Sequence, residues 1–146
     1  MEEYFTALSR AFSDYRQDIE DFEHKSKPTD GLFGFGRSLQ NDACNDRFDK
    51  HVEQAVTDLV SAGPSPEDAE RAIRMILSQD TRAWPLAAQW MLRAVERHCI
   101  PLTPFLTPAA AATLQKEYAG RYRPWDRLPA QKQLLQALNK AQSDKG

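Results

Sequence analysis

Long apolar runs are absent from this chain of 146 residues, and cysteine is scarce, with only Cys44 and Cys99. No stretch approaches the ~20 consecutive apolar residues that a bilayer-spanning helix needs, so no membrane partner is expected. The first ten residues, MEEYFTALSR, are acidic where a secretory signal is basic and then apolar. Two distant cysteines in a chain of this size do not predict a disulfide framework. The sequence therefore predicts a cytoplasmic protein with two reduced thiols.

The composition is that of an ordinary folded protein, with 41% hydrophobic and 27% charged residues. Residues 1–146 are long enough for one domain with its own core. The net charge of −2 conceals an asymmetry, because residues 1–70 hold 16 Asp/Glu and 7 Lys/Arg, whereas residues 71–146 hold 5 and 12. Either the two halves pack against each other or the basic half meets a polyanion. The first interpretation is favoured.

Apolar periodicity predicts helices in the first half of the chain. The first is about twenty residues long, ends before Pro28 and carries an apolar stripe of Phe5, Leu8, Phe12, Tyr15, Ile19 and Phe22. The second begins at an Asn41 or Asp42 cap, ends at Gly63 and carries Cys44, Phe48, Val52, Ala55, Val56 and Leu59.

Capping signals predict four further helices. The third has Ser65 as its cap with Asp68 in a capping box, and runs to Gln79. The fourth begins near Pro85, stops at Pro101 and carries Leu86, Trp90, Met91, Ala94 and Val95 on one face. The fifth has Thr107 as its cap and closes at Gly120, and the sixth starts near Pro129 with Leu134, Leu135 and Leu138 on one face.

These signals predict an all-α fold, a single-domain antiparallel bundle or array of about six helices. Residues 27–41 form a Gly/Phe loop in this prediction, and residues 140–146 are frayed. The aromatic stripe of the first helix is core in a monomer. It becomes an interface if that helix docks on a second copy, and a homodimer is then expected.

Half of the six glycines fall in DGLFGFGRS, residues 30–38. A phosphate-binding loop is disfavoured, because no strand precedes it and neither the GxGxxG order nor a GxxxxGK[ST] lysine is present. An irregular connection whose phenylalanines fold back over the core is the favoured interpretation. The alternative is a partner-binding knob formed by Phe33 and Phe35.

Catalytic and metal-binding patterns are weak. Cys44 with His51, or His98 with Cys99, would have to converge with further ligands to hold zinc, and no CxxC or HxxxH spacing supports this. Both cysteines fall where thiols are usually inert core residues. We therefore expect no catalytic residue, no metal site and no cofactor, and keep a small helical metal-binding protein as the third hypothesis.

The segment KEYAGRYRPWDRLPAQK interleaves arginines with aromatic residues, namely Arg121, Tyr122, Arg123, Trp125 and Arg127. This alternation is typical of single-stranded nucleic-acid binding. We favour an internal role instead, in which Trp125 and Tyr118 anchor the segment and the arginines meet the acidic N-terminal helices, because a pI of about 5.9 lacks the basic excess of nucleic-acid binders.

The resulting hypothesis is a non-catalytic interaction or regulatory module that acts through a protein–protein surface. Its candidate partner-binding residues are Phe33, Phe35, Arg121, Tyr122, Arg123, Trp125 and Arg127. A nucleic-acid-binding accessory protein that uses residues 121–127 is the alternative.

Overall fold

The computed structural model describes residues 1–25 and 35–143, with the backbone alone for residues 22–25, 35–42 and 87. Within these ranges the chain forms α-helices and 3-10 helices and no strand, which confirms the predicted all-α class. The six α-helices are α1 (Glu2–Lys25), α3 (Phe35–Ser61), α4 (Pro66–Leu77), α5 (Leu86–Ala94), α6 (Pro108–Ala119) and α7 (Pro129–Ser143). The 3-10 helices are η1 (Thr81–Ala83), η2 (Val95–Phe105) and η3 (Pro124–Asp126).

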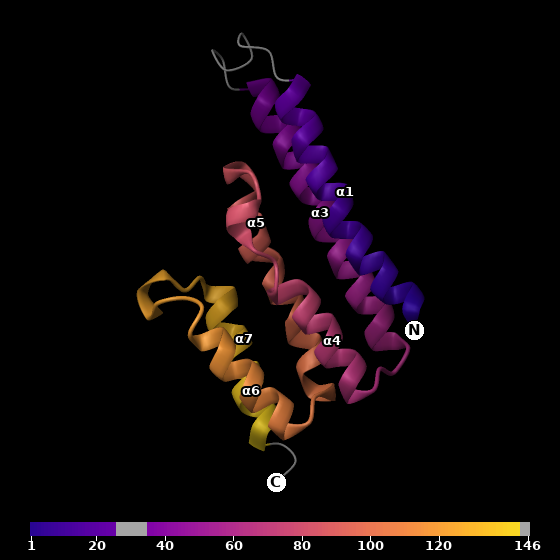
Figure 1. The fold of residues 1–146 in the computed structure, drawn as a ribbon, viewed down its shortest axis with the longest axis vertical. Helices are drawn as coiled ribbons and strands as arrows, with labels where there is room; N and C mark the ends of the chain where they lie inside the picture. The colour runs from indigo at the N-terminus through magenta and orange to yellow at the C-terminus, as the bar shows by residue number, and fades with distance from the viewer. Residues whose placement is uncertain (26–34, 144–146) are drawn as a thin grey trace.

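Helices α1 and α3 lie side by side along most of their length (Figure 1). Aromatic rings fill the space between them: Tyr15 stacks on Phe48 with ring centroids 4.1 Å apart, and Phe12 meets Phe48 edge-on at 5.2 Å. The predicted stripe of α1 is buried within this single chain, at Phe5, Leu8, Phe12, Tyr15 and Ile19. The stripe is therefore core, and it leaves no apolar face of α1 free for a second copy over these positions.

The predicted capping chemistry is present at three helix ends. The Ser65 hydroxyl accepts a hydrogen bond from the Asp68 N–H, and the Asp68 carboxylate accepts one from the Ser65 N–H. Thr107 caps α6 through the Ala110 N–H. Gly63 follows α3 with φ +69°, a left-handed conformation that glycine adopts without steric cost.

Two predicted boundaries of ordered structure are wrong. Helix α3 begins at Phe35, so residues 35–41 are helical and Asn41 and Asp42 lie inside the helix instead of capping it. No proline interrupts residues 35–61, so the helix extends past the expected cap. At the other end of the chain α7 reaches Ser143 and buries Ala141, so residues 140–143 are helical and not frayed. Phe33 lies outside the described residues.

The prediction that Pro101 stops the fourth helix is also wrong. After Ala94 the chain passes from α5 into η2, an 11-residue 3-10 helix that contains Pro101 and Pro104. Three residues per turn align side chains at every third position, and Glu96, Cys99 and Leu102 share this spacing and are all buried. The burial of this row stabilises a 3-10 segment far longer than the usual three or four residues.

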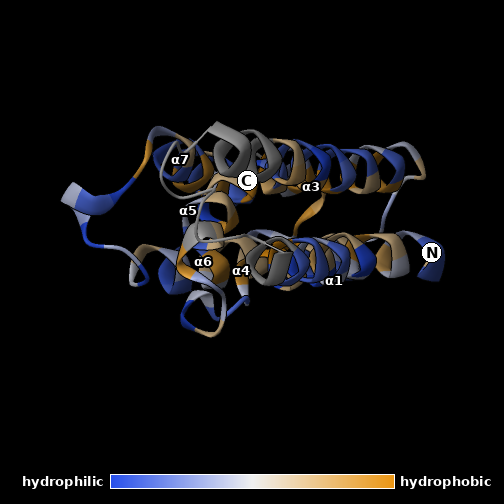
Figure 2. Ribbon diagram, turned by 90° about the horizontal axis from the view of Figure 1, so that it is seen from above, coloured by the Kyte–Doolittle hydropathy of each residue, from blue (hydrophilic) through white to orange (hydrophobic). Residues whose placement is uncertain are grey.

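The helix η2 is the central element of the fold. It packs against α3, α4, α5 and α7. Seen from above, α3 and α7 form one layer and α1, α4 and α6 the other, with α5 between them (Figure 2). Because η2 contacts helices of both layers, it joins the α1–α3 pair to the C-terminal helices.

Replacement of Phe48 tests the aromatic core. Phe48→Ala removes a ring that is 1% exposed and contacts both Phe12 and Tyr15, so the free energy of unfolding is expected to fall by about 3–5 kcal/mol in urea denaturation. As a control, Leu86→Ala truncates a side chain that is 83% exposed and should change it by no more than about 0.5 kcal/mol. Similar losses in the two variants would contradict this description of the core.

Candidate interaction surface

Large apolar side chains are exposed in two neighbouring segments. On α5, Leu86 is 83% and Trp90 54% exposed, and at i, i+4 they share a face of the helix. In and after η3, Trp125 is 75% and Leu128 39% exposed. The third tryptophan, Trp84, is buried against Tyr15, so exposure is not a general property of tryptophan in this fold.

Arg93 connects the two segments. It lies one turn after Trp90 on α5 and donates hydrogen bonds to the backbone oxygen of Asp126, at 2.5 Å, and to Gln131 Oε1, at 2.8 Å. Asp126 is the covalent neighbour of Trp125. The hydrogen bond from Arg93 to Asp126 places the end of α5 next to η3. We name as the Trp–Arg surface the residues Leu86, Trp90, Arg93, Arg121, Arg123, Trp125 and Leu128.

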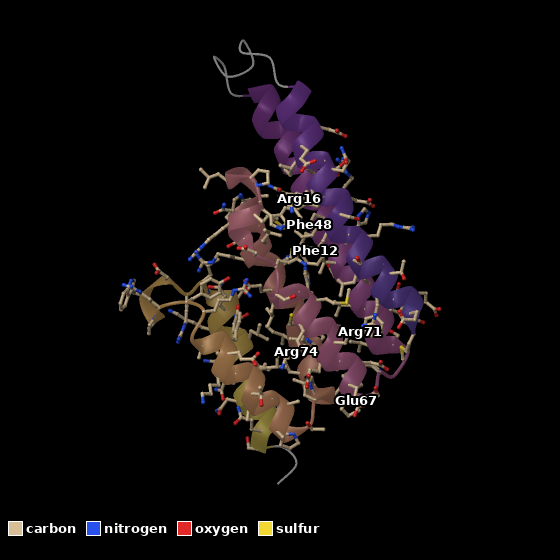
Figure 3. All side chains as sticks on the ribbon, viewed as in Figure 1. Phe12, Arg16, Phe48, Glu67, Arg71 and Arg74 are labelled. Carbon is tan, nitrogen blue, oxygen red and sulfur yellow. The ribbon has the colours of Figure 1, made fainter. Side chains whose placement is uncertain are left out.

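The arginines of the described part fall into two groups. One group forms ion pairs with carboxylates, as Arg71 does with Glu2 at 2.6 Å and Arg97 with Asp49 at 2.6 Å; its members on α4 are labelled in Figure 3. The other group has no carboxylate oxygen within 4.0 Å among the described residues and consists of Arg10, Arg82, Arg93, Arg121, Arg123 and Arg127. Except for Arg10, every member lies between residues 82 and 127.

Like Arg93, Arg121 and Arg127 contact backbone oxygens and not the acidic N-terminal helices. Arg121 donates to the backbone oxygen of Gln79 at 2.8 Å, after α4, and Arg127 donates to that of Ala119 at 3.0 Å, at the end of α6. Their donors thus satisfy carbonyls near helix ends, which lack intrahelical partners. The predicted contact of these arginines with the N-terminal helices is wrong, because Arg71 and Arg97 make the ion pairs that join the two halves.

A buried carboxylate anchors the segment after α6. Glu96, in η2, is 2% exposed and accepts hydrogen bonds from the hydroxyls of Tyr118 and Tyr122, both at 2.6 Å. The two rings meet edge-on with centroids 5.9 Å apart, and the Arg93 guanidinium lies over the Tyr122 ring at 4.4 Å. Tyr122 is therefore a supporting residue, and its hydroxyl is already used inside the protein.

Burial governs the protonation of this cluster. It raises the pKa of the Glu96 carboxyl, while the two tyrosine hydrogen bonds and the nearby cations Arg121 and Arg93 act in the opposite direction. Burial also raises the pKa of both tyrosines, and the adjacent carboxylate adds to the effect. The hydroxyls consequently remain protonated and able to donate to Glu96 over the whole neutral range.

The predicted partner-binding residues occupy different environments. Arg123 and Trp125 are exposed, with the guanidinium 5.6 Å from the ring centroid. Trp125 therefore does not anchor the segment, whereas Tyr118, which is 3% exposed, does. Arg121 is exposed and Arg127 is half-buried. Phe35 is the first residue of α3 and only its backbone is described, while Phe33 lies outside the described residues.

Leu86 and Trp90 are surface residues, so the predicted grouping of these two with the buried Met91 and Val95 on one face is wrong. The buried stripe is formed instead by Ala88, Met91 and Leu92 of α5 and continues to Val95, the first residue of η2. These residues also recur at helical spacing, so the sequence contained two candidate apolar faces for this helix. The buried face includes the small Ala88, whereas the larger Leu86 belongs to the exposed face. The stripe that includes Ala88 was therefore the signal in the sequence from which the exposure of Leu86 and Trp90 could have been predicted.

The residues considered for metal binding and nucleophilic catalysis do not gather into a ligand set or a reactive thiol site in the described part of the chain. Cys99 is wholly buried, and Cys44 is buried with Arg47 donating to its sulfur at 3.4 Å. Burial raises the pKa of both thiols, which lowers the population of the nucleophilic thiolate. His98 Nε2 shares a hydrogen bond with Asp49 Oδ1 at 2.8 Å. Among the side chains that the structure describes, no three from His, Cys, Asp or Glu form a group that would hold a metal ion.

Among the described helices, none combines the length and the apolar character needed to cross a bilayer. Comparison with known proteins finds no matching family model, no similar curated protein and no similar solved structure. The function is therefore inferred from the geometry of this chain.

The Glu96 cluster predicts a defined pH dependence. The pKa of Glu96 is higher in the folded than in the unfolded chain, for which the ordinary carboxyl value is 4.5. Between these two pKa values the folded state binds more protons than the unfolded state. The contribution of Glu96 to the free energy of unfolding therefore falls as pH rises from the unfolded to the folded pKa. Glu96→Gln removes this pH-dependent contribution, because glutamine does not titrate. The free energy of unfolding of the variant minus that of wild type, measured by urea denaturation, should therefore increase from acidic to neutral pH. Exposed Glu53→Gln is the control and should show no such trend.

Removal of the whole side chain should have the opposite effect. Glu96→Ala leaves the Tyr118 and Tyr122 hydroxyls without their acceptor, and the free energy of unfolding is expected to fall by about 2–4 kcal/mol. An alanine variant as stable as Glu96→Gln at neutral pH would show that the two hydrogen bonds contribute little.

Proposed function

We propose that this protein is a non-catalytic interaction module that binds an acidic segment of a protein partner through the Trp–Arg surface. The observation that carries the proposal is the combination of two exposed tryptophans, Trp90 and Trp125, with arginines that have no carboxylate partner in the described part of the chain. The tryptophans supply contact area, and the guanidinium groups determine the charge of the partner.

The exposed aromatic residues support binding of a protein. Tryptophan and arginine are the residue types most enriched among those that dominate binding energy at interfaces. An indole that is 75% exposed, as in Trp125, gains the burial of its apolar area only when a partner covers it. Trp90 and Leu86 offer the same gain on the adjacent face of α5.

The charge of the surface supports an acidic partner. Arg93 and Arg121 already donate to backbone oxygens, and the Arg93 Nε is buried. Each guanidinium has five N–H donors, so the exposed Arg121 and Arg123 keep donors for an incoming carboxylate. Charge-assisted hydrogen bonds to carboxylates are stronger than neutral ones. A basic partner would instead meet the like charges of Arg121 and Arg123, which have no carboxylate oxygen within 4.0 Å in the described part of the chain.

The internal contacts support a surface that is already formed before binding. The Glu96 hydrogen bonds hold Tyr118 and Tyr122, and Arg93 holds Asp126, so both sides of Trp125 along the chain are tied to η2 or α5. A surface fixed in this way loses less conformational entropy when a partner binds.

Peptide selection tests the proposal and does not require an identified partner. Peptides from a random displayed library are selected on the wild-type protein, with counter-selection on the Trp90→Ala/Trp125→Ala/Arg123→Ala variant. We expect the enriched peptides to combine Asp or Glu with aromatic or aliphatic residues and to bind more weakly as ionic strength rises. Enriched peptides without acidic bias, or peptides that bind the triple variant equally well, would contradict the proposal.

Single variants then assign the binding energy. For a selected peptide measured by fluorescence anisotropy, Trp125→Ala is expected to weaken binding at least about tenfold, as for an aromatic hot spot. The matched control is Arg10→Ala, which removes an arginine that also lacks a described carboxylate partner but belongs to α1. This control should alter the affinity by no more than about twofold. Equal losses in both variants would indicate non-specific electrostatic binding.

A second copy of the chain is one acidic partner to consider, because residues 1–70 carry 16 Asp/Glu against 7 Lys/Arg. Light scattering of wild type and of the Trp90→Ala/Trp125→Ala variant would reveal such a dimer. Free, buried thiols at Cys44 and Cys99 support a cytoplasmic setting for the interaction, since that compartment keeps cysteines reduced.

Single-stranded nucleic acid is the second candidate partner. The exposed pair of Arg123 and Trp125 favours it, since a guanidinium beside an aromatic face suits both a phosphate and a stacked base. If this candidate is right, a labelled oligothymidylate should bind at low salt, with a steep salt dependence that becomes shallower in Arg121→Ala/Arg123→Ala/Arg127→Ala. Absence of binding at low salt would remove it.

A further inference from the structure

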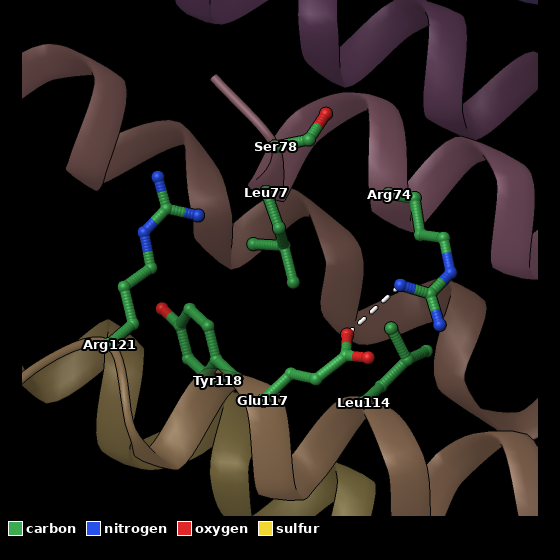
Figure 4. A pocket seen from close by; sticks show the side chains of 7 residues that line it. All are labelled: Arg74, Leu77, Ser78, Leu114, Glu117, Tyr118 and Arg121. Atoms are coloured by element: carbon green, nitrogen blue, oxygen red, sulfur yellow. Dashed lines mark hydrogen bonds and ion pairs between the residues drawn. The ribbon is translucent and has the colours of Figure 1, made fainter. Parts of the chain in front are cut away.

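A pocket of about 180 Å³ lies between the end of α4, α6 and Arg121, the second residue after α6 (Figure 4). Its wall contains Leu77 from the end of α4 and Leu114 and Tyr118 from α6, with Ser78 at its edge. The three larger side chains are at most 8% exposed, so they form an apolar floor that the core holds in place. The remaining wall residues, Arg74, Glu117 and Arg121, carry charge.

The charges of the pocket are unequal at its two sides. On one side Arg74 is neutralised, because it pairs with Glu117 at 2.9 Å and with Glu70 at 3.2 Å. On the other side Arg121 donates to the backbone oxygen of Gln79 and has no carboxylate within ion-pair distance in the described part of the chain. Figure 4 shows the two arginines flanking the apolar side chains. Counted over the lining residues alone, two arginines and one glutamate leave one positive charge, while Glu70 beside Arg74 and the buried Glu96 near Arg121 lie outside the lining.

We infer that this pocket binds a small organic monoanion, with its carboxylate on Arg121 and its apolar part on Leu77, Leu114 and the Tyr118 ring. The volume limits the apolar part, because drug-sized ligands occupy pockets of roughly 300–1,000 Å³, whereas an apolar cavity of roughly 150 Å³ holds benzene. One ring or a short chain fits. A second negative charge on the ligand would find no cation, because Arg74 is already paired with Glu117, and the Glu117 carboxylate would repel it.

The inference is independent of the proposed function, although Arg121 contributes to both sites. The Trp–Arg surface acts through exposed indoles on α5 and η3, whereas none of the pocket residues is a tryptophan. Variants of Arg123, which contacts Trp125 and does not line the pocket, distinguish failure of one site from failure of the other.

Benzoate is the probe for the test. Amide chemical shifts of the ¹⁵N-labelled full chain are followed during titration, with benzamide as a ring without charge and acetate as a charge without ring. We expect saturable shifts centred on residues 77, 78, 114 and 118, with a Kd of about 1 mM, a value suited to so small a ligand. Benzamide and acetate should each bind at least about tenfold more weakly. Equal binding of either control, or benzoate shifts that do not saturate or do not centre on the pocket, would overturn the inference.

Two variants locate the binding. Arg121→Gln removes the unpaired cation and should weaken benzoate binding about tenfold, whereas the matched Arg123→Gln should leave it within about twofold. Ser78→Phe places a ring at the exposed edge of the pocket and should abolish binding while the far-UV circular dichroism spectrum stays that of the wild type. Unchanged benzoate affinity in folded Arg121→Gln or in folded Ser78→Phe would overturn the inference.

Discussion

The burial of one carboxylate on the central 3-10 helix is the constraint on which the C-terminal half depends. Glu96 lies in the same buried row as Cys99 and Leu102, where an ionised side chain without partners would be costly. The hydroxyls of Tyr118 and Tyr122 supply those partners. The position of η2 therefore determines where α6 ends and where the chain leads next, and through it the location of Trp125.

The same constraint relates the two candidate sites. The Tyr118 ring forms part of the floor of the pocket at α4 and α6, while its hydroxyl donates to Glu96. Tyr122 is the second donor, and the Arg93 guanidinium lies over its ring. Arg93 in turn donates a hydrogen bond to the backbone oxygen of Asp126, the residue after Trp125. A continuous series of contacts thus connects the pocket with the Trp–Arg surface through a single buried carboxylate.

Local sequence signals were sufficient to predict the fold class. The features that they did not predict are determined by tertiary packing. The Ser65 and Thr107 caps and the stripe from Phe5 to Ile19 depend on residues close in sequence, and all were found. The path through Pro101 depends on the burial of Cys99 and Leu102 against four other helices, which no local pattern reveals. For the site, composition identified the 121–127 segment, but only the fold separates the supporting Tyr122 from the exposed Arg123 and Trp125.

The unequal placement of the three tryptophans has an optical consequence. Trp84 emits from an apolar interior, whereas Trp90 and Trp125 emit from positions in contact with water. Collisional quenchers dissolved in water therefore reach two of the three indoles while the chain is folded. The intrinsic fluorescence of the protein consequently separates into an accessible component, which belongs to the Trp–Arg surface, and a shielded component, which belongs to the core.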